Sequence, residues 1–289
     1  MGKVWSINNN FGENKKIKEN YIFILSFILP MVIMFVVFTS LGVGFIGDKT
    51  IVSSDMYTQY VAYFGKFKDI LSGDGSIFYS FNKSIGGNNI GLFAYYLASP
   101  LNLLLILFPK SAIGEFIFII YLIKIGLASL CFSLYISKVY KKKDLFVVIF
   151  SLCYALMSYN ICFQMNIMWM DGMMLLPLVA LGIEEIILKG KYKLYMIVLF
   201  MVVVSNYYIG YMICIFSVVY FFYKSIIYKK ISLPRTFKFF GASFITGGLA
   251  SFLLIPVLIS LSTGKADFNL FSEAITIKQN LSSFLSKLF

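Results

Sequence analysis

The stretch YIFILSFILPMVIMFVVFTSLGVGF, residues 21–45, contains no charged side chain and decides the class of fold. A helix that crosses a bilayer needs about 20 consecutive, mainly apolar residues. The stretch is longer than the apolar region of about 7–15 residues in a secretory signal peptide, so we expect an uncleaved membrane helix. Residues 1–20, which are polar and basic, are interpreted as a cytoplasmic segment.

The rest of the 289-residue chain has the same apolar character. Hydrophobic residues make up 60% and charged residues 13%, with a mean hydropathy of +0.85. Soluble domains carry about 25% charged residues, so this composition excludes an ordinary soluble enzyme, a disordered chain and a coiled coil. Histidine is absent, which excludes His-based triads and metal sites. Four cysteines lie inside apolar runs without a CxxC pair, which argues against disulfides or a zinc site.

Further apolar segments predict an all-α, polytopic bundle of about seven spans over residues 21–262. Four basic clusters, at the N-terminus and near 138–143, 189–193 and 229–235, then fall on one side of the membrane. This agreement with the positive-inside rule predicts a cytoplasmic N-terminus. Topology accounts for the net charge of +12, and we expect no nucleic acid to bind. The further spans are expected at 116–137, 145–163, 173–188, 194–209, 211–227 and 237–262.

The same topology places residues 47–115 outside the cell as one long first loop. Apolar residues after Asp55 recur with helical spacing, which predicts an amphipathic helix on the outer interface. A turn-rich segment follows, and the apolar stretch 94–109 is short for a span and contains Pro100. We interpret this stretch as interfacial or re-entrant. The residues of the predicted helical face are Met56, Tyr60, Tyr63, Phe64, Phe67, Ile70 and Leu71.

Two aspartates stand at the external starts of predicted helices. Asp55 follows two serines, and Asp171 begins the span in MWMDGMMLLP. An N-cap is the simplest interpretation of each residue, and a catalytic carboxylate is the alternative for Asp55. Asp171, near Asn166 and Trp169, could instead orient an acceptor or hold a divalent metal together with Asp55.

Several other residues allow both a structural and a functional interpretation. Lys124 lies well inside a predicted span, where a charge costs about 2.5–3.5 kcal/mol, so it either pairs with another residue or binds a lipid phosphate. Glu184 and Glu185 are explained by an i,i+4 pair with Lys189 at the inner end of a span. The glycine-rich stretch 86–91 lacks the rest of a phosphate-loop motif and is interpreted as a turn.

Four strings of sequence, in this order and spacing, resemble the YfhO family of bacterial membrane proteins. The resemblance implies a GT-C type glycosyltransferase that takes sugar from a polyprenyl-phosphate donor on the external face of the cell membrane. The acceptor it implies is a cell-wall polymer such as lipoteichoic acid. Members of the family are longer, so we expect this chain to be an N-terminal portion in which 263–289 begins an external segment. The strings are SSDMYTQY (53–60), GGNNIGLFAYYLASPLNLLLILFP (86–109), MNIMWMDGMMLLPLVALGIEE (165–185) and SNYYIGYM (205–212).

The resemblance assigns a role to Asp55, and the chemistry of the implied reaction suggests roles for other residues. Asp55 matches the essential acidic residue of the first external loop and would be the general base. Lys124, Lys83 or Lys110, or a divalent metal, would stabilise the charge of the leaving phosphate. No other cofactor is expected, and the expected partners are membrane lipid, the lipid-linked sugar, the polymer acceptor and an enzyme that makes the lipid-linked sugar. Substrate contacts are expected from Gln59, Asn88, Asn166, Trp169, Asp171 and Asn206.

Two functions of other classes remain open at this point. A flippase or transporter of lipid-linked sugar would use the same external groove without chemistry, so that Asp55→Asn would leave transport intact. A non-catalytic scaffold of cell-envelope assembly would use its interfacial aromatic residues for docking. Only the scaffold would keep its function after the loss of both Asp55 and Lys124.

Overall fold

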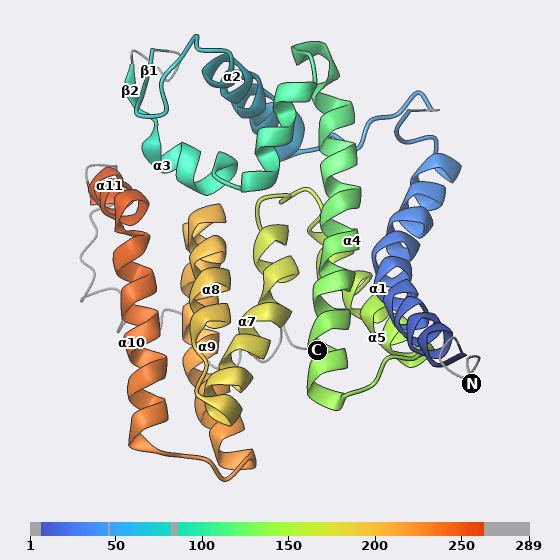
Figure 1. Ribbon diagram of the computed structural model, residues 1–289. Helices are drawn as coiled ribbons and strands as arrows, with labels where there is room; N and C mark the ends of the chain where they lie inside the picture. Colours follow the sequence, from blue (N-terminus) through green and yellow to red (C-terminus); the bar gives the residue numbers. More distant parts are fainter. Residues whose placement is uncertain (1–6, 46, 82–85, 263–289) are drawn as a thin grey trace, which may run out of the picture.

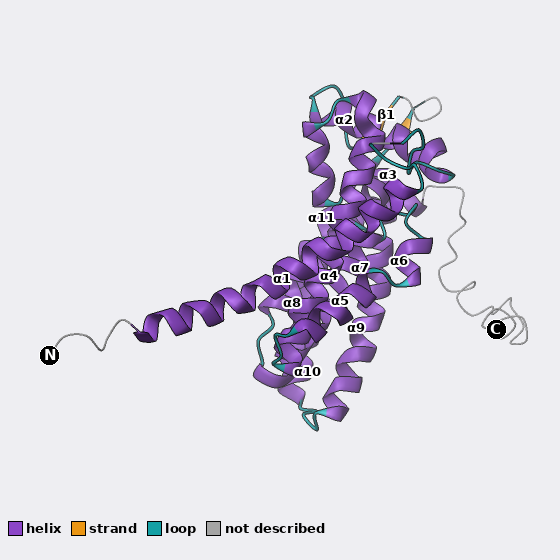
Figure 2. Ribbon diagram, turned by 90° about the vertical axis from the view of Figure 1, so that its right-hand side faces the viewer, coloured by secondary structure: helices purple, strands orange, loops and turns teal. Residues whose placement is uncertain are grey.

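The computed structural model describes residues 7–45, 47–81 and 86–262 as a helical bundle covered at one end by the segments between residues 47 and 112 (Figures 1 and 2). Within these residues the only strands are two antiparallel strands of two residues each, so the all-α prediction is confirmed. The elements in chain order are α1 (Ile7–Ser40), η1 (Met56–Tyr60), α2 (Val61–Leu71), β1 (Tyr79–Ser80), β2 (Gly87–Asn88), α3 (Ile90–Leu92), η2 (Phe93–Leu97), η3 (Pro100–Leu107), η4 (Lys110–Ala112), α4 (Ile113–Tyr140), α5 (Leu145–Ala155), α6 (Ser158–Cys162), α7 (Met170–Lys189), α8 (Lys193–Ser205), α9 (Tyr207–Ile227), α10 (Leu233–Leu249) and α11 (Ser251–Ser262).

Helix α4 is the centre of the bundle. It packs against α1, α5 and α7, and α7 in turn packs against α8 and α9. The contact between α4 and α1 is aromatic, with the ring of Phe118 edge-on to Phe35 and Phe38. The contact between α7 and α8 depends on Gly182, where a Cβ atom would lie 2.7 Å from the backbone of Tyr195. A small residue at this position therefore allows the two helix backbones to approach closely.

The number of potential spans is lower than the seven predicted. Among the described residues, three helices are long and apolar enough to cross a membrane, and two bent helix pairs raise the total to at most five. Helices α5 and α8 have only 11 and 13 residues, well below the length of about 20 that a span requires. The predicted span 145–163 ends early at Ala155, and 237–262 is bent by 69° between α10 and α11. The three single spans are Asn20–Ser40, Lys110–Tyr140 and Tyr207–Ile227.

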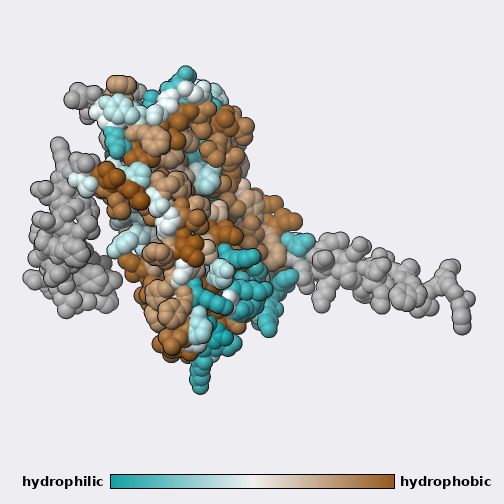
Figure 3. Space-filling view, turned by 60° about the vertical axis from the view of Figure 1, so that its left-hand side comes forward, coloured by the Kyte–Doolittle hydropathy of each residue, from teal (hydrophilic) through white to brown (hydrophobic). Residues whose placement is uncertain are grey.

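The surface agrees with a membrane location. Large apolar side chains are exposed along the helices, among them Phe244 of α10 at 84% and Val219 of α9 at 63%. Figure 3 shows apolar surface over much of the bundle and a group of hydrophilic side chains at its lower end. Such contiguous apolar surface is typical of contact with lipid rather than water.

The amphipathic helix predicted after Asp55 is confirmed as η1 followed by α2. Its buried residues recur at helical spacing, at Met56, Tyr60, Phe64 and Phe67. They pack onto η3 and the start of α4, where the ring of Phe64 lies edge-on to Phe116. The outer loop is therefore folded onto the bundle and holds the residues next to Asp55 in place.

The segment from α3 to η3 agrees with the interfacial or re-entrant prediction. Its halves, Ile90–Leu97 and Pro100–Leu107, meet at 87°, and neither is long enough to span a bilayer. Figure 1 shows the segment lying across the ends of α7 and α8, beneath α2. The preceding turn-rich region contains the β1–β2 hairpin, in which Gly86 has a φ of 109°, as expected for a turn.

Candidate functional site

A cluster of polar and aromatic residues, which we name the external cluster after its predicted side of the membrane, forms where the loop between α1 and α4 meets the N-terminal ends of α7 and α9. The Tyr60 hydroxyl donates a hydrogen bond of 3.0 Å to Oδ1 of Asn166. Trp169 Nε1 donates to the Tyr95 hydroxyl at 3.1 Å, and Asn206 Nδ2 donates to the Tyr95 carbonyl at 2.7 Å. These bonds join four segments that are far apart in the sequence. The external cluster consists of Tyr60, Tyr95, Tyr96, Asn166, Trp169 and Asn206.

Tyrosine rings form a continuous wall in this cluster. The ring of Tyr96 lies 5.1 Å from that of Tyr60 and 4.9 Å from that of Tyr63, measured between centroids. Tyr95 lies 4.7 Å from Tyr96 and 5.9 Å from Tyr207. Each tyrosine combines an apolar ring face with a polar tip, which suits a ligand that carries both C–H and hydroxyl groups.

Asp55 lies exposed at the edge of the external cluster. Its side chain makes no hydrogen bond that caps η1, so the N-cap interpretation of Asp55 is not supported. The residue before it, Ser54, adopts a left-handed backbone with φ of 50°. Burial raises the pKa of the Tyr60 hydroxyl above its ordinary value of 10, and electrostatic interactions with Tyr96 and Asp55 add to this rise. Tyr60 therefore stays protonated as a donor beside the Asp55 carboxylate.

Lys124 and Asp171 form a buried ion pair. Lys124 Nζ lies 2.6 Å from Oδ2 of Asp171 and 2.9 Å from the Ile167 carbonyl oxygen. The Ser99 hydroxyl donates to the other carboxylate oxygen, Oδ1, at 2.8 Å. Both side chains of the pair are 1% exposed. The pairing interpretation of Lys124 is confirmed, and a lipid phosphate does not have access to its ammonium group in this arrangement.

The same geometry corrects the interpretation of Asp171 as an N-cap. Helix α7 begins at Met170, so Asp171 already lies in its first turn, and its carboxylate points to Lys124 rather than to the backbone. The position is still favourable, because the positive end of the helix dipole stabilises a carboxylate there. Asp171 thus ties α7 to α4 and to Ser99, at the bend of the re-entrant segment.

The other predicted site residues are divided between the external cluster and the rest of the loop. The structure brings Asn166, Trp169 and Asn206 together in the external cluster. Asn206 also caps α9, because its Oδ1 accepts a hydrogen bond from the Ile209 N–H. Lys110 forms an ion pair with Asp69 of α2.

The structure does not show Gln59, Asn88 or Lys83 among the residues of the external cluster. Gln59 is part-buried on η1, and Oδ1 of Asn88 accepts a hydrogen bond from the backbone of Ile90 at the start of α3. Lys83 lies outside the described residues. The role expected for each of them in binding substrate remains a prediction.

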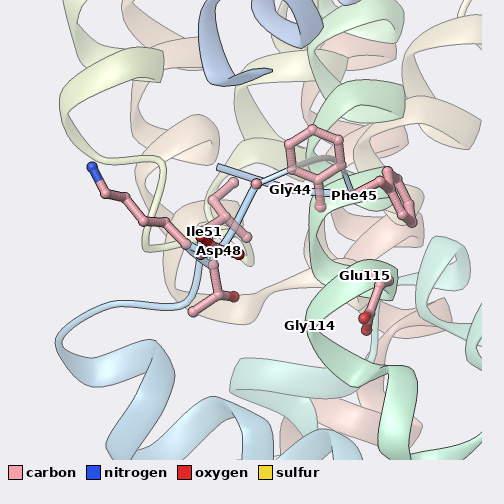
Figure 4. A pocket seen from close by; sticks show the side chains of 10 residues that line it. Gly44, Phe45, Asp48, Ile51, Gly114 and Glu115 are labelled. Carbon is pink, nitrogen blue, oxygen red and sulfur yellow. The ribbon is translucent and has the colours of Figure 1, made fainter. Parts of the chain in front are cut away.

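A small pocket of about 250 Å³ lies between the loop after α1 and the start of α4. Figure 4 shows Asp48 on the loop and Glu115 on α4 at separate sides of this pocket. Asp55 does not line it, so we do not assign the pocket to the candidate site. Within the described ranges, no three His, Cys, Asp or Glu side chains form a group that could hold a metal ion. Both Asp171 oxygens already have protein partners, so a metal shared by Asp55 and Asp171 does not fit.

One polar cluster at the opposite half of the bundle was not predicted. Glu184 is 2% exposed, and its Oε1 lies 2.9 Å from Lys224 Nζ. Three tyrosine hydroxyls donate to the same carboxylate, from Tyr135 at 3.2 Å, Tyr220 at 2.8 Å and Tyr228 at 2.8 Å. The spacing of Tyr220, Lys224 and Tyr228, four residues apart on one face of a helix, was the available sequence signal.

The predicted pair with Lys189 is made by Glu185 alone, at 3.6 Å. Sequence reasoning also assigned no role to Tyr95 and Tyr96, which lie at the middle of the external cluster. Two adjacent aromatic residues with polar tips inside an apolar segment were the signal for them.

Comparison with known proteins gives one match. The family model described as bacterial membrane protein YfhO matches residues 26–289, which is most of the chain. No curated protein and no solved structure matches it significantly.

Proposed function

The chain belongs to the YfhO family of bacterial membrane proteins, and from this premise we propose that it is a GT-C type glycosyltransferase. It moves a sugar from a polyprenyl-phosphate donor to a cell-wall polymer, such as lipoteichoic acid, on the external face of the membrane. The observation that carries this proposal is the position of Asp55. Its exposed carboxylate stands at the start of η1, the helix that contributes Tyr60 to the wall of tyrosines, and Asp55 contributes to the raised pKa of both Tyr60 and Tyr96.

Asp55 acts as the general base in this proposal. It takes the proton from an acceptor hydroxyl as the oxygen attacks the anomeric carbon of the donor sugar. A new carbon–oxygen bond forms, the bond from the anomeric carbon to the phosphate breaks, and its electron pair stays on the leaving phosphate. The base and the leaving group then lie on opposite sides of the sugar, which inverts the anomeric configuration.

The external cluster binds and orients the sugar. The ring faces of Tyr95 and Tyr96 contact its C–H groups, and the amide N–H groups of Asn166 donate to its hydroxyls, while Trp169 orients Tyr95 through its hydrogen bond to the Tyr95 hydroxyl. Lys124 has a positioning role. Its ion pair holds Asp171, which accepts a hydrogen bond from Ser99 and so fixes the segment that carries Tyr95. The bent segment and the amphipathic helix after Asp55 guide the lipid chain of the donor toward the site.

The experiment compares sugar transfer by wild type, Asp55→Asn and Asp48→Asn in membrane vesicles, at equal protein levels. The substrates are a labelled polyprenyl-phosphate sugar and a teichoic-acid-type acceptor. Loss of a general base lowers the rate of a reaction by about 10²–10⁴-fold. The rate of sugar transfer by Asp55→Asn should therefore be at least about 10²-fold below that of wild type. Asp48 is a carboxylate of the same loop that lies in the separate pocket, so its variant should transfer at the wild-type rate.

Transfer by Asp55→Asn at the wild-type rate would show that Asp55 is not the base. Equal losses in both variants would mean that any change in loop charge lowers activity, which also contradicts the assignment. If wild type moves labelled lipid across the bilayer and transfers no sugar, a flippase replaces the transferase.

A further inference from the structure

A groove lies between α4 and α5, at the half of the bundle that carries the basic loops. It has a volume of about 610 Å³, within the usual range for a small-molecule site. Its walls are mainly apolar, while one end carries a cation and a carboxylate. The residues that define the groove are Phe132, Ile136, Val147 and Phe150 along its walls, and Lys142 and Asp144 at its polar end.

The walls of the groove are held by contacts outside it. The ring of Phe132 stacks on Tyr154 of α5, with centroids 4.4 Å apart and planes 2° from parallel. Tyr135, which also lines the groove, directs its hydroxyl to Glu184 and Tyr220 in the bundle interior. The tyrosine therefore turns its polar tip away and leaves ring surface for an apolar ligand. This fixed arrangement indicates a preformed groove rather than a chance gap between helices.

The polar end lies in the turn between the two helices. Lys141 has a left-handed backbone with φ of 55°, so the chain reverses sharply where α4 ends. Lys141 and Lys142 are both exposed in this turn. Asp144 has one carboxylate oxygen, Oδ1, that is buried and accepts no hydrogen bond from the described residues. A buried acceptor without a partner is costly, so a ligand that donates a hydrogen bond here would be favoured.

We propose that this groove binds one anionic phospholipid whose headgroup carries hydroxyls, as in phosphatidylglycerol. One acyl chain lies along Phe132, Ile136 and Phe150, and the phosphate pairs with Lys142. A headgroup hydroxyl donates to Oδ1 of Asp144. Basic pockets at the membrane boundary between helices select anionic headgroups, and lipid is the solvent on this face of the protein. The inference is independent of the proposed transferase activity, which is assigned to the other end of the bundle.

The experiment counts lipids that stay bound to the protein in native mass spectrometry. Protein is equilibrated with equal amounts of phosphatidylglycerol, phosphatidylcholine and phosphatidic acid before transfer from the micelle. The variants are Lys142→Glu, Asp144→Ala and Ile136→Trp, which fills the groove. The matched control is Lys191→Glu, which changes an exposed lysine in another loop of the same basic side. Thermal unfolding of each variant confirms that it is folded.

Wild type should retain one phosphatidylglycerol in preference to the other two lipids. Lys142→Glu and Ile136→Trp should lower this occupancy at least fivefold, while Lys191→Glu leaves it unchanged. Asp144→Ala should remove the preference for phosphatidylglycerol over phosphatidic acid, which lacks the headgroup hydroxyls. Equal losses in both lysine variants, or equal retention of phosphatidylcholine by wild type, would mean that lipid only surrounds the protein non-specifically and would overturn the proposal. Retention of no lipid by folded wild type would overturn it too.

Discussion

Lys124 Nζ and Asp171 Oδ2 lie 2.6 Å apart in the interior of the bundle, and each side chain is 1% exposed. Their contact joins α4 to α7, and Ser99 adds the re-entrant segment through its hydrogen bond to the same carboxylate. Two charges are removed from water here, so the pair holds the structure only while both partners remain. The pair supports the external cluster indirectly, because Ser99 follows the segment that carries Tyr95 and Tyr96, and Asp171 follows Trp169 at the start of α7.

Removal of either charge should destabilise the protein strongly. We expect Lys124→Met or Asp171→Asn alone to lower the free energy of unfolding by about 3–5 kcal/mol, because each leaves an uncompensated buried charge. The double variant should lose less than the sum of the two single losses. Unfolding in detergent, followed by the circular dichroism of all four proteins, gives the coupling energy. Strict additivity would show that the two charges do not interact.

Tyr60→Phe should separate the hydrogen bond of Tyr60 from its ring packing. The phenylalanine ring keeps the contact with Tyr96 but removes the donor to Asn166, at a cost of about 1 kcal/mol in stability. If the external cluster orients the sugar, the variant should also raise the KM for the lipid-linked donor several-fold. Tyr57→Phe on the same short helix is the control, since Tyr57 is 74% exposed. A KM unchanged from wild type in Tyr60→Phe would place the sugar elsewhere.

Two adjacent glutamates should differ sharply in their effect on stability. Glu184→Gln removes the charge that pairs with Lys224 and accepts from three tyrosines, and should cost about 3 kcal/mol. Glu185→Gln breaks only an exposed pair with Lys189 and should change stability by less than about 1 kcal/mol. Thermal unfolding of the two variants in the same detergent provides the comparison. Similar midpoints would contradict the buried network.

A methyl group at Gly182 should disturb the contact between α7 and α8. In Gly182→Ala the Cβ would lie 2.7 Å from the Tyr195 backbone, so the helices must separate, and we expect a loss of about 1–3 kcal/mol. Gly241 of α10 has no atom within 4 Å of an added Cβ. Gly241→Ala should therefore leave stability unchanged or raise it by up to about 1 kcal/mol, because alanine favours the helix. A Gly182→Ala protein with the wild-type melting temperature would contradict the close approach.

Local sequence patterns predicted the helices and the outer loop. The spacing of Met56, Tyr60, Phe64 and Phe67 predicted the buried face of the amphipathic helix, because burial on a helix follows its 3.6-residue period. The described helices give three to five candidate spans by length and composition where the sequence predicted about seven, because hydropathy alone does not reveal where a helix ends or bends. Ala155 ends α5 after 11 residues, and no local signal distinguishes it from the apolar residues around it.

The candidate site was predicted less completely than the fold, because it depends on pairs that are distant in the sequence. Asn166 and Trp169 were expected to face the same external space, and the structure places both in the external cluster. The partner of Lys124 was not foreseen, since it lies 47 residues away on another helix. Spacing identifies residues that share one helix face, while the pairing of two helices is set by packing across the whole bundle.

Ser99 and Lys124 both contact Asp171 in the folded protein, but the three residues are synthesised at different times. Ser99 precedes Asp171 by 72 residues and Lys124 precedes it by 47. At a translation rate of about 5–20 residues per second, Asp171 follows Lys124 by roughly 2–9 s. Lys124 therefore enters the membrane ahead of its counter-ion, and the strongly apolar sequence around it must carry the charge during that interval. The ion pair forms only when α7 has joined α4, so the bend at Ser99 gains its hydrogen bond to Asp171 only at that late stage of biogenesis.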